Sequence, residues 1–168
     1  MGAIDINNIK TQIKSILEAA NTTTASQDLS SGLSKRVQRV LKVHPARIPI
    51  EAVSIPWVTI FTDAKEVDID LIGHGSNSRV NTTRKAEVFI NIVGAVMNPI
   101  FTDIENDLAS EEVEDLMENI EHILRANFNL NSSVQYHYPV RTDFFEDIYE
   151  EETLFRAGVL EISCKIFY

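Results

Sequence analysis

The sequence is short of residues on which many protein functions depend. Its 168 residues include one cysteine, Cys164, which excludes an intrachain disulfide and a zinc site built from several thiolates. No apolar run approaches the roughly 20 residues needed to span a bilayer. The start, Met1–Lys10, lacks the basic and apolar segments of a secretory signal. We therefore expect a protein of a reducing compartment, with no membrane contact.

Basic residues are also in deficit. The chain carries 15 Lys and Arg against 25 Asp and Glu, which gives a formal net charge of −10 at pH 7. Proteins bind a phosphate backbone by neutralising it, so this chain should repel nucleic acid. Sequence-independent binding is thereby disfavoured, whereas an acidic wall suits a channel through which DNA must pass without sticking.

Catalytic and metal-binding motifs are missing as well. No two histidines have the spacing that would place both on one metal ion; they are His44, His74, His122 and His137. The turn Gly73-x-Gly75 lacks the third glycine of a phosphate-binding loop, and no serine stands in a Gly-x-Ser-x-Gly elbow. The sequence predicts no catalytic residue, no bound metal and no cofactor.

What is present is an ordinary globular composition at single-domain length. Hydrophobic residues make up 44% and charged residues 24% of the chain, so we expect one domain over residues 1–168. Apolar residues at steps of three and four predict helices over residues 5–20, 33–43 and 110–126. The short helix at 33–43 has a basic side and ends before Pro45.

Alternating apolar and polar residues predict five strands. They cover residues 48–61, 66–72, 85–93, 132–139 and 157–168. We expect the first two to pair as a hairpin across Thr62–Glu66, and prolines place the first near a sheet edge. The predicted fold is α+β, with a mixed or mainly antiparallel β-sheet packed by two to three α-helices.

Two polar stretches are candidate contact surfaces. Residues 73–84 carry almost no apolar side chain and cannot offset the entropy of ordering, which predicts a mobile loop. Residues 143–152 combine six carboxylates with four apolar side chains, three of them aromatic, which suggests an acidic loop that contacts another protein. An exposed loop whose aromatic rings pack onto the core explains the same composition.

Taken in order, these elements resemble the tail terminator, or tail completion, proteins of long-tailed bacteriophages. The likeness lies in the pattern and order of the elements and covers most of the chain. Its parts are the amphipathic start Ile6–Ala20, the strand Val53–Phe61, the polar loop Gly73–Arg84, the strand Lys85–Val93, the segment Phe101–Ile104, the helix through Leu124, and the acidic loop before Val159–Tyr168.

The resemblance implies a structural protein, not an enzyme, at the neck end of a virion tail assembled in the host cytoplasm. Such subunits form a hexameric ring on the tail tube, stop its growth and present a surface to the head connector or stopper protein. Genome DNA passes through the ring without specific binding.

Carried over to this chain, the resemblance makes loop 73–84 the tail-tube contact, through the cations Arg79, Arg84 and Lys85. Loop 143–152 becomes an inter-subunit or lumen surface. Its expected contact residues are Asp143, Phe144, Phe145, Glu146, Asp147 and Glu150.

Three other interpretations stay open. Another neck or minor tail protein, such as a stopper or adaptor, would be equally poor in motifs. A small metal-dependent hydrolase using Asp68, Asp70 and Asp103 predicts stoichiometric binding of a divalent cation. A cytosolic regulatory domain predicts a closed apolar pocket for a small ligand.

Overall fold

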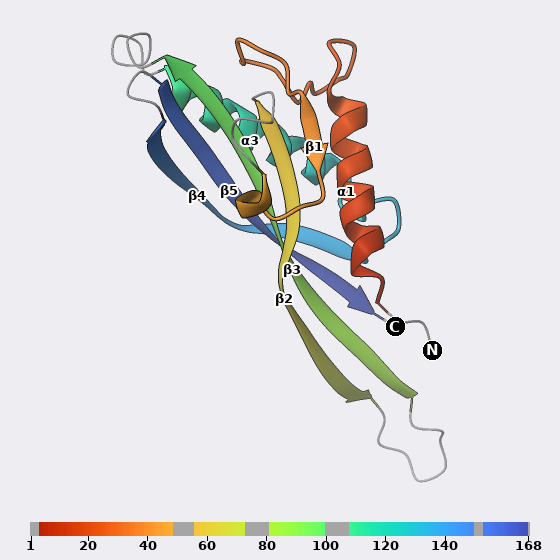
Figure 1. Ribbon diagram of the computed structural model, residues 1–168. Coiled ribbons are helices and arrows are strands. Elements are labelled where there is room, and N and C mark those ends of the chain that lie inside the picture. Colours follow the sequence, from red (N-terminus) through yellow and green to blue (C-terminus); the bar gives the residue numbers. More distant parts are fainter. Residues whose placement is uncertain (1–3, 49–55, 73–80, 100–107, 150–152, 168) are drawn as a thin grey trace.

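A five-stranded β-sheet with helices against one face forms the framework of the protein (Figure 1). The computed structural model describes residues 4–48, 56–72, 81–99, 108–149 and 153–167. The elements are α1 (Ile6–Ala20), β1 (Arg39–Leu41), the short 3-10 helix η1 (Pro45–Arg47), β2 (Trp57–Ile72), β3 (Asn81–Pro99), α3 (Leu108–Ala126), β4 (Tyr136–Tyr149) and β5 (Thr153–Phe167). The predicted single α+β domain is confirmed.

The sheet is mixed, with the strand order β1-β2-β3-β5-β4. β1 and β2 run parallel, whereas the pairs β2/β3, β3/β5 and β5/β4 are antiparallel. The two sheet edges are therefore β1, which is three residues long, and β4, which is 14 residues long.

Both long helices form where the apolar period predicts them. In α1 the Asp5 carboxylate accepts a hydrogen bond from the backbone N–H of Asn8 at 2.9 Å, a contact that caps the first turn. The buried face of this helix consists of Ile9, Ile13, Ile16 and Leu17. In α3 the corresponding residues are Val113, Leu116, Met117, Ile120, Ile123 and Leu124. The buried faces of both helices pack against the sheet and form one hydrophobic core with it.

The predicted helix at residues 33–43 does not form. Residues 39–41 instead make β1, in which Val40 lies beside Val58 of β2. Val37 and Val40 are both buried, as the helical pattern predicts, but an extended chain buries the two side chains equally well. Pairing with β2 also gives β-branched residues a favourable backbone conformation, and this tertiary contact overrides the local helical pattern.

The predicted hairpin across Thr62–Glu66 is wrong, because residues 57–61 of the first predicted strand and all of the second, 66–72, belong to a single strand, β2. This strand pairs with β3 along its whole length, with a register shift between Thr62 and Ala64. The polar residues at this point form a β-bulge, which bends a strand without ending it. Residues 49–55 of the first predicted strand lie outside the described residues.

β3 is longer than the predicted strand 85–93. Its pairing with β5 stops at Lys85, whereas its pairing with β2 continues to Asn81. The ends of β2 and β3 therefore project past the rest of the sheet as a two-stranded arm (Figure 1). The predicted loop 73–84 is wrong for residues 81–84, which are strand, and residues 73–80 lie outside the described part of the chain.

The acidic loop predicted at 143–152 is wrong as far as residue 149, because β4 continues to Tyr149; residues 150–152 are not among those described. β4 starts later than the predicted strand 132–139 and passes a register shift between Pro139 and Arg141. β5 starts at Thr153, earlier than the predicted 157–168. As an edge strand, β4 carries charged residues on both faces. They hide the alternation of apolar and polar residues that identifies a strand in a sequence.

Two glycines let α3 approach the sheet closely. Gly94 of β3 and Gly158 of β5 are direct partners in the ladder. A Cβ atom on Gly158 would stand 2.4 Å from Cγ of Met117, and one on Gly94 would stand 2.8 Å from Cδ2 of Leu116. The glycine pair forms the hollow into which these two helix side chains pack. The opposite face of the sheet holds a smaller apolar cluster of Trp57, Val93, Ala95 and Ala157.

Candidate assembly surfaces

The acidic segment predicted as a contact surface lies on β4, at the edge of the sheet. Only one side of β4 is paired, to β5, and no described strand covers the other. Phe144 and Phe145 project to opposite faces and are 52% and 49% exposed. Asp143, Glu146 and Asp147 lie on the same strand, whereas Glu150 lies outside the described residues.

A groove separates β4 from α3 on the helix side of the sheet. It consists of two hollows of about 340 and 330 Å³, and Phe144 and Glu114 line both. We call it the acidic groove, after Glu114, Glu118, Glu121 and Glu146, which line it together with Phe144. An apolar floor with an acidic rim favours a ligand that is both basic and apolar.

Two of the four glutamates of the acidic groove are paired with arginines. Glu146 pairs with Arg156 at 3.0 Å, and Glu121 pairs with Arg125 of the same helix. Glu114 and Glu118 are exposed and add further negative charge, so the rim of the groove is negative overall.

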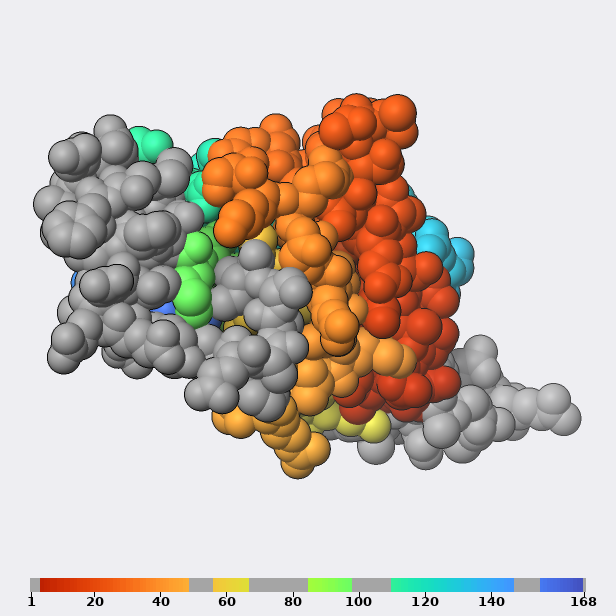
Figure 2. All heavy atoms as spheres, turned by 45° about the horizontal axis from the view of Figure 1, so that its top comes forward, coloured from red at the N-terminus to blue at the C-terminus, as the bar shows by residue number. Residues whose placement is uncertain are grey.

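The other edge of the sheet carries the opposite charge. Residues 35–47, which include β1 and η1, contain five basic residues and no acidic one: Lys35, Arg36, Arg39, Lys42 and Arg47. All except Arg36 are exposed, and the segment lies on the surface beside α1 (Figure 2). We call residues 35–47 the basic segment. The basic residues are evident in the sequence, but the helical pattern predicted for residues 33–43 placed them on the side of a helix and did not indicate a contact surface.

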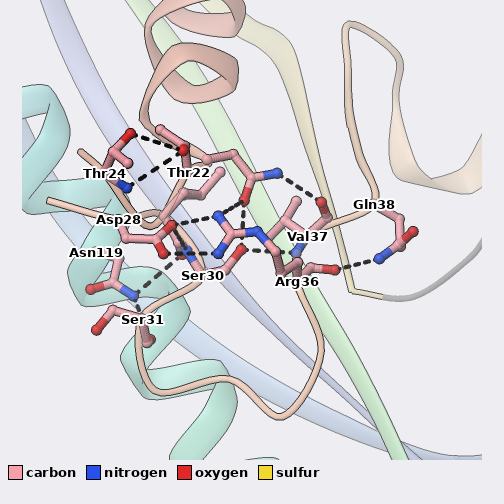
Figure 3. A network of polar contacts seen from close by, with 11 residues as sticks. Thr22, Thr24, Asp28, Ser30, Ser31, Arg36, Val37, Gln38 and Asn119 are labelled. Atoms are coloured by element: carbon pink, nitrogen blue, oxygen red, sulfur yellow. Dashed lines mark hydrogen bonds and ion pairs between the residues drawn. The ribbon is translucent and has the colours of Figure 1, made fainter.

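A polar network fixes the start of the basic segment (Figure 3). The Arg36 guanidinium donates hydrogen bonds to both carboxylate oxygens of Asp28, at 2.9 and 2.8 Å, and this contact lowers the pKa of Asp28. Asn21, at the end of α1, donates to the Val37 carbonyl at 2.8 Å and accepts from the Ser30 hydroxyl at 2.6 Å. These bonds tie the chain to α1 just before it enters β1.

The predicted tail-tube residues are strand residues where the structure describes them. Lys85 stands opposite Asp68 of β2, and its ammonium lies 5.9 Å from the ring centre of Phe167, within cation–π range. Arg84 is its neighbour at the base of the arm, whereas Arg79 lies outside the described residues.

A polar cluster that sequence analysis missed lies on the face away from the helices. Glu87 of β3 accepts hydrogen bonds from Lys165 and Ser163 of β5, and from the hydroxyl of Tyr138 of β4 at 3.2 Å. The Lys165 contact is the main reason why the pKa of Glu87 is lowered and that of Lys165 raised. Because these groups satisfy one another, the cluster links three strands and offers no unpaired base.

The reactive side chains that are described are buried or isolated. Burial raises the pKa of the Cys164 thiol to about 12, which suppresses the nucleophilic thiolate. Burial also lowers the pKa of His137, whose Nε2 lies 3.0 Å from a carbonyl oxygen of α3. Among the described side chains, no three His, Cys, Asp or Glu residues lie close enough to hold a metal ion. Asp103 and the side chains of Asp68 and Asp70 are outside that set.

The described helices include none that is long and apolar enough to cross a membrane. No protein-family model matches the chain, and comparison with curated protein sequences returns no match.

Proposed function

We propose that the protein is a structural assembly subunit that caps the end of a bacteriophage tail tube as a ring. Each subunit contacts a copy of itself on either side and the tube below. The observation that carries this proposal is the 14-residue edge strand β4, unpaired on one side among the described residues and bearing exposed Phe144 and Phe145. A long edge strand leaves a row of backbone N–H and C=O groups open to pairing with another chain.

A ring on a tube needs one kind of surface for neighbouring subunits and another for the tube. In this proposal the two sheet edges meet neighbouring subunits, and the β2–β3 arm, with Arg84 and Lys85 at its base, reaches the tube. The ring is a hexamer whose outer rim meets the head connector or stopper protein. The net charge of −10 keeps passing DNA from adhering to it.

Electron micrographs of tubes assembled from the tail-tube protein of the same phage test the proposal. Tubes formed with the chain present should stop growing and carry a ring at one end. The double variant Arg84→Glu/Lys85→Glu should leave the ends bare, whereas Lys10→Glu/Lys14→Glu, an equal charge change on α1, should retain the ring. Bare ends and unchanged growth with the unaltered chain would contradict the proposal. Binding to the head connector alone would favour the stopper or adaptor interpretation.

A further inference from the structure

We propose that copies of this chain join head to tail, with the acidic groove of one copy holding the basic segment of the next. This inference rests on the proposed function, because it names the partner of the β4 edge. The occupant of the groove is a second copy of the chain, and the contact buries the edge that a single copy leaves open.

Charge selects this occupant. The acidic groove lies beside β4, at one end of the strand order, and the basic segment includes β1, at the other end. A groove rimmed by Glu114 and Glu118 attracts the four exposed cations of the basic segment, which contains no acidic residue. Two grooves facing each other would instead bring like charges together, which disfavours a symmetric dimer through this surface.

Apolar residues on both surfaces also favour contact between the acidic groove and the basic segment. Phe144 lines the groove and is 52% exposed. In the basic segment, half-buried Leu41 and Val43 stand on either side of exposed Lys42. Covering Phe144 with these aliphatic side chains removes apolar surface from water while the cations reach the acidic rim.

The geometry also decides which assemblies are possible. A contact between two different surfaces leaves each copy with one free groove and one free basic segment. Further copies add in the same way until the chain of subunits closes, so this contact produces a ring when the rotation per subunit permits closure.

Two charge-reversed variants test the contact. The first, Glu114→Lys/Glu118→Lys, makes the groove basic, and the second, Arg39→Glu/Arg47→Glu, makes the basic segment acidic. All four side chains are exposed, so the folds should survive, and circular dichroism checks this. Asp63→Lys/Glu66→Lys, on exposed positions of β2, is the control with the same charge change as the first variant.

Association is measured by sedimentation up to millimolar concentration at low salt. Each variant alone should associate at least about tenfold more weakly than the unaltered chain, because like charges then meet at the contact. Mixing the two variants should restore association, since each reversed surface then meets its complement on the other variant. The control should behave as the unaltered chain.

Three results would overturn the inference: an unaltered chain that stays monomeric throughout, single variants that associate normally, or a mixture that fails to recover. These outcomes are separate from the tube experiment. Rings on tubes that persist with both variants would reject the contact and retain the proposed function. Recovery in the mixture, together with bare tubes, would retain the contact and reject tail capping.

Discussion

Replacing Gly158 by alanine should destabilise the protein by overpacking the hollow beneath α3. The new Cβ would stand 2.4 Å from Cγ and 2.9 Å from Sδ of Met117, and 3.2 Å from Cε1 of Phe144. Met117 is only 2% exposed and has little room to move. Overpacking costs about 1–3 kcal/mol, whereas removing a glycine from a strand returns about 0.5–1 kcal/mol. We expect a net loss of about 1–2 kcal/mol in the free energy of unfolding.

Urea denaturation followed by circular dichroism measures this loss as a lower midpoint at unchanged slope. Gly94→Ala should cost less, because the closest contact of its new Cβ, to Cδ2 of Leu116, is 2.8 Å and therefore longer than the 2.4 Å at Gly158. Met117→Ala alone should cost about 2–5 kcal/mol, but in the Gly158→Ala background it relieves the clash, so the two costs should not add. Wild-type stability for Gly158→Ala, or strict additivity, would refute the close approach of α3 to the sheet.

Three further predictions concern ionisable groups. Because burial lowers the pKa of His137, the free energy of unfolding should fall as pH drops below the unfolded value of about 6.5; His137→Gln should flatten this slope in urea titrations, and an equal slope would contradict it. Cys164 should resist a thiol reagent until urea unfolds the chain, because its pKa is about 12; rapid native labelling would exclude its burial. Since the pKa of Asp28 is lowered by Arg36, its contribution should be present above pH of about 3.9 and disappear as pH falls further. The stability gap to Asp28→Asn should therefore narrow in acid, and a constant gap would argue against the ion pair.

The helices were predictable because each is amphipathic along its whole length and needs no distant partner to define its buried face. Strand β1 was not predictable, because the valines of residues 33–43 occupy positions that a helix and an extended chain bury equally well. Only the neighbouring Val58 decides between them, and it is distant in sequence. The sequence pattern predicted two strands in place of β2, because a bulge and a turn use the same polar residues.

The candidate site was predictable in part. The mixture of carboxylates and aromatic rings at 143–152 marked a surface, and the exposure of Phe144 and Phe145 agrees with that. The groove was not predictable, because Glu114 and Glu118 look like the ordinary solvent face of a helix until β4 is placed beside them. The basic segment at residues 35–47 was not predicted as a contact surface, because the sequence pattern predicted a helix at residues 33–43 and that prediction was wrong.

A cryo-microscopy map of the capped end of a tail tube would show both proposed contacts at once. We predict a closed ring of copies in which residues 35–47 of each subunit lie in the α3–β4 groove of its neighbour, with the β2–β3 arms against the tube. A ring whose β4 edges face solvent, or a tube end without this protein, would contradict it.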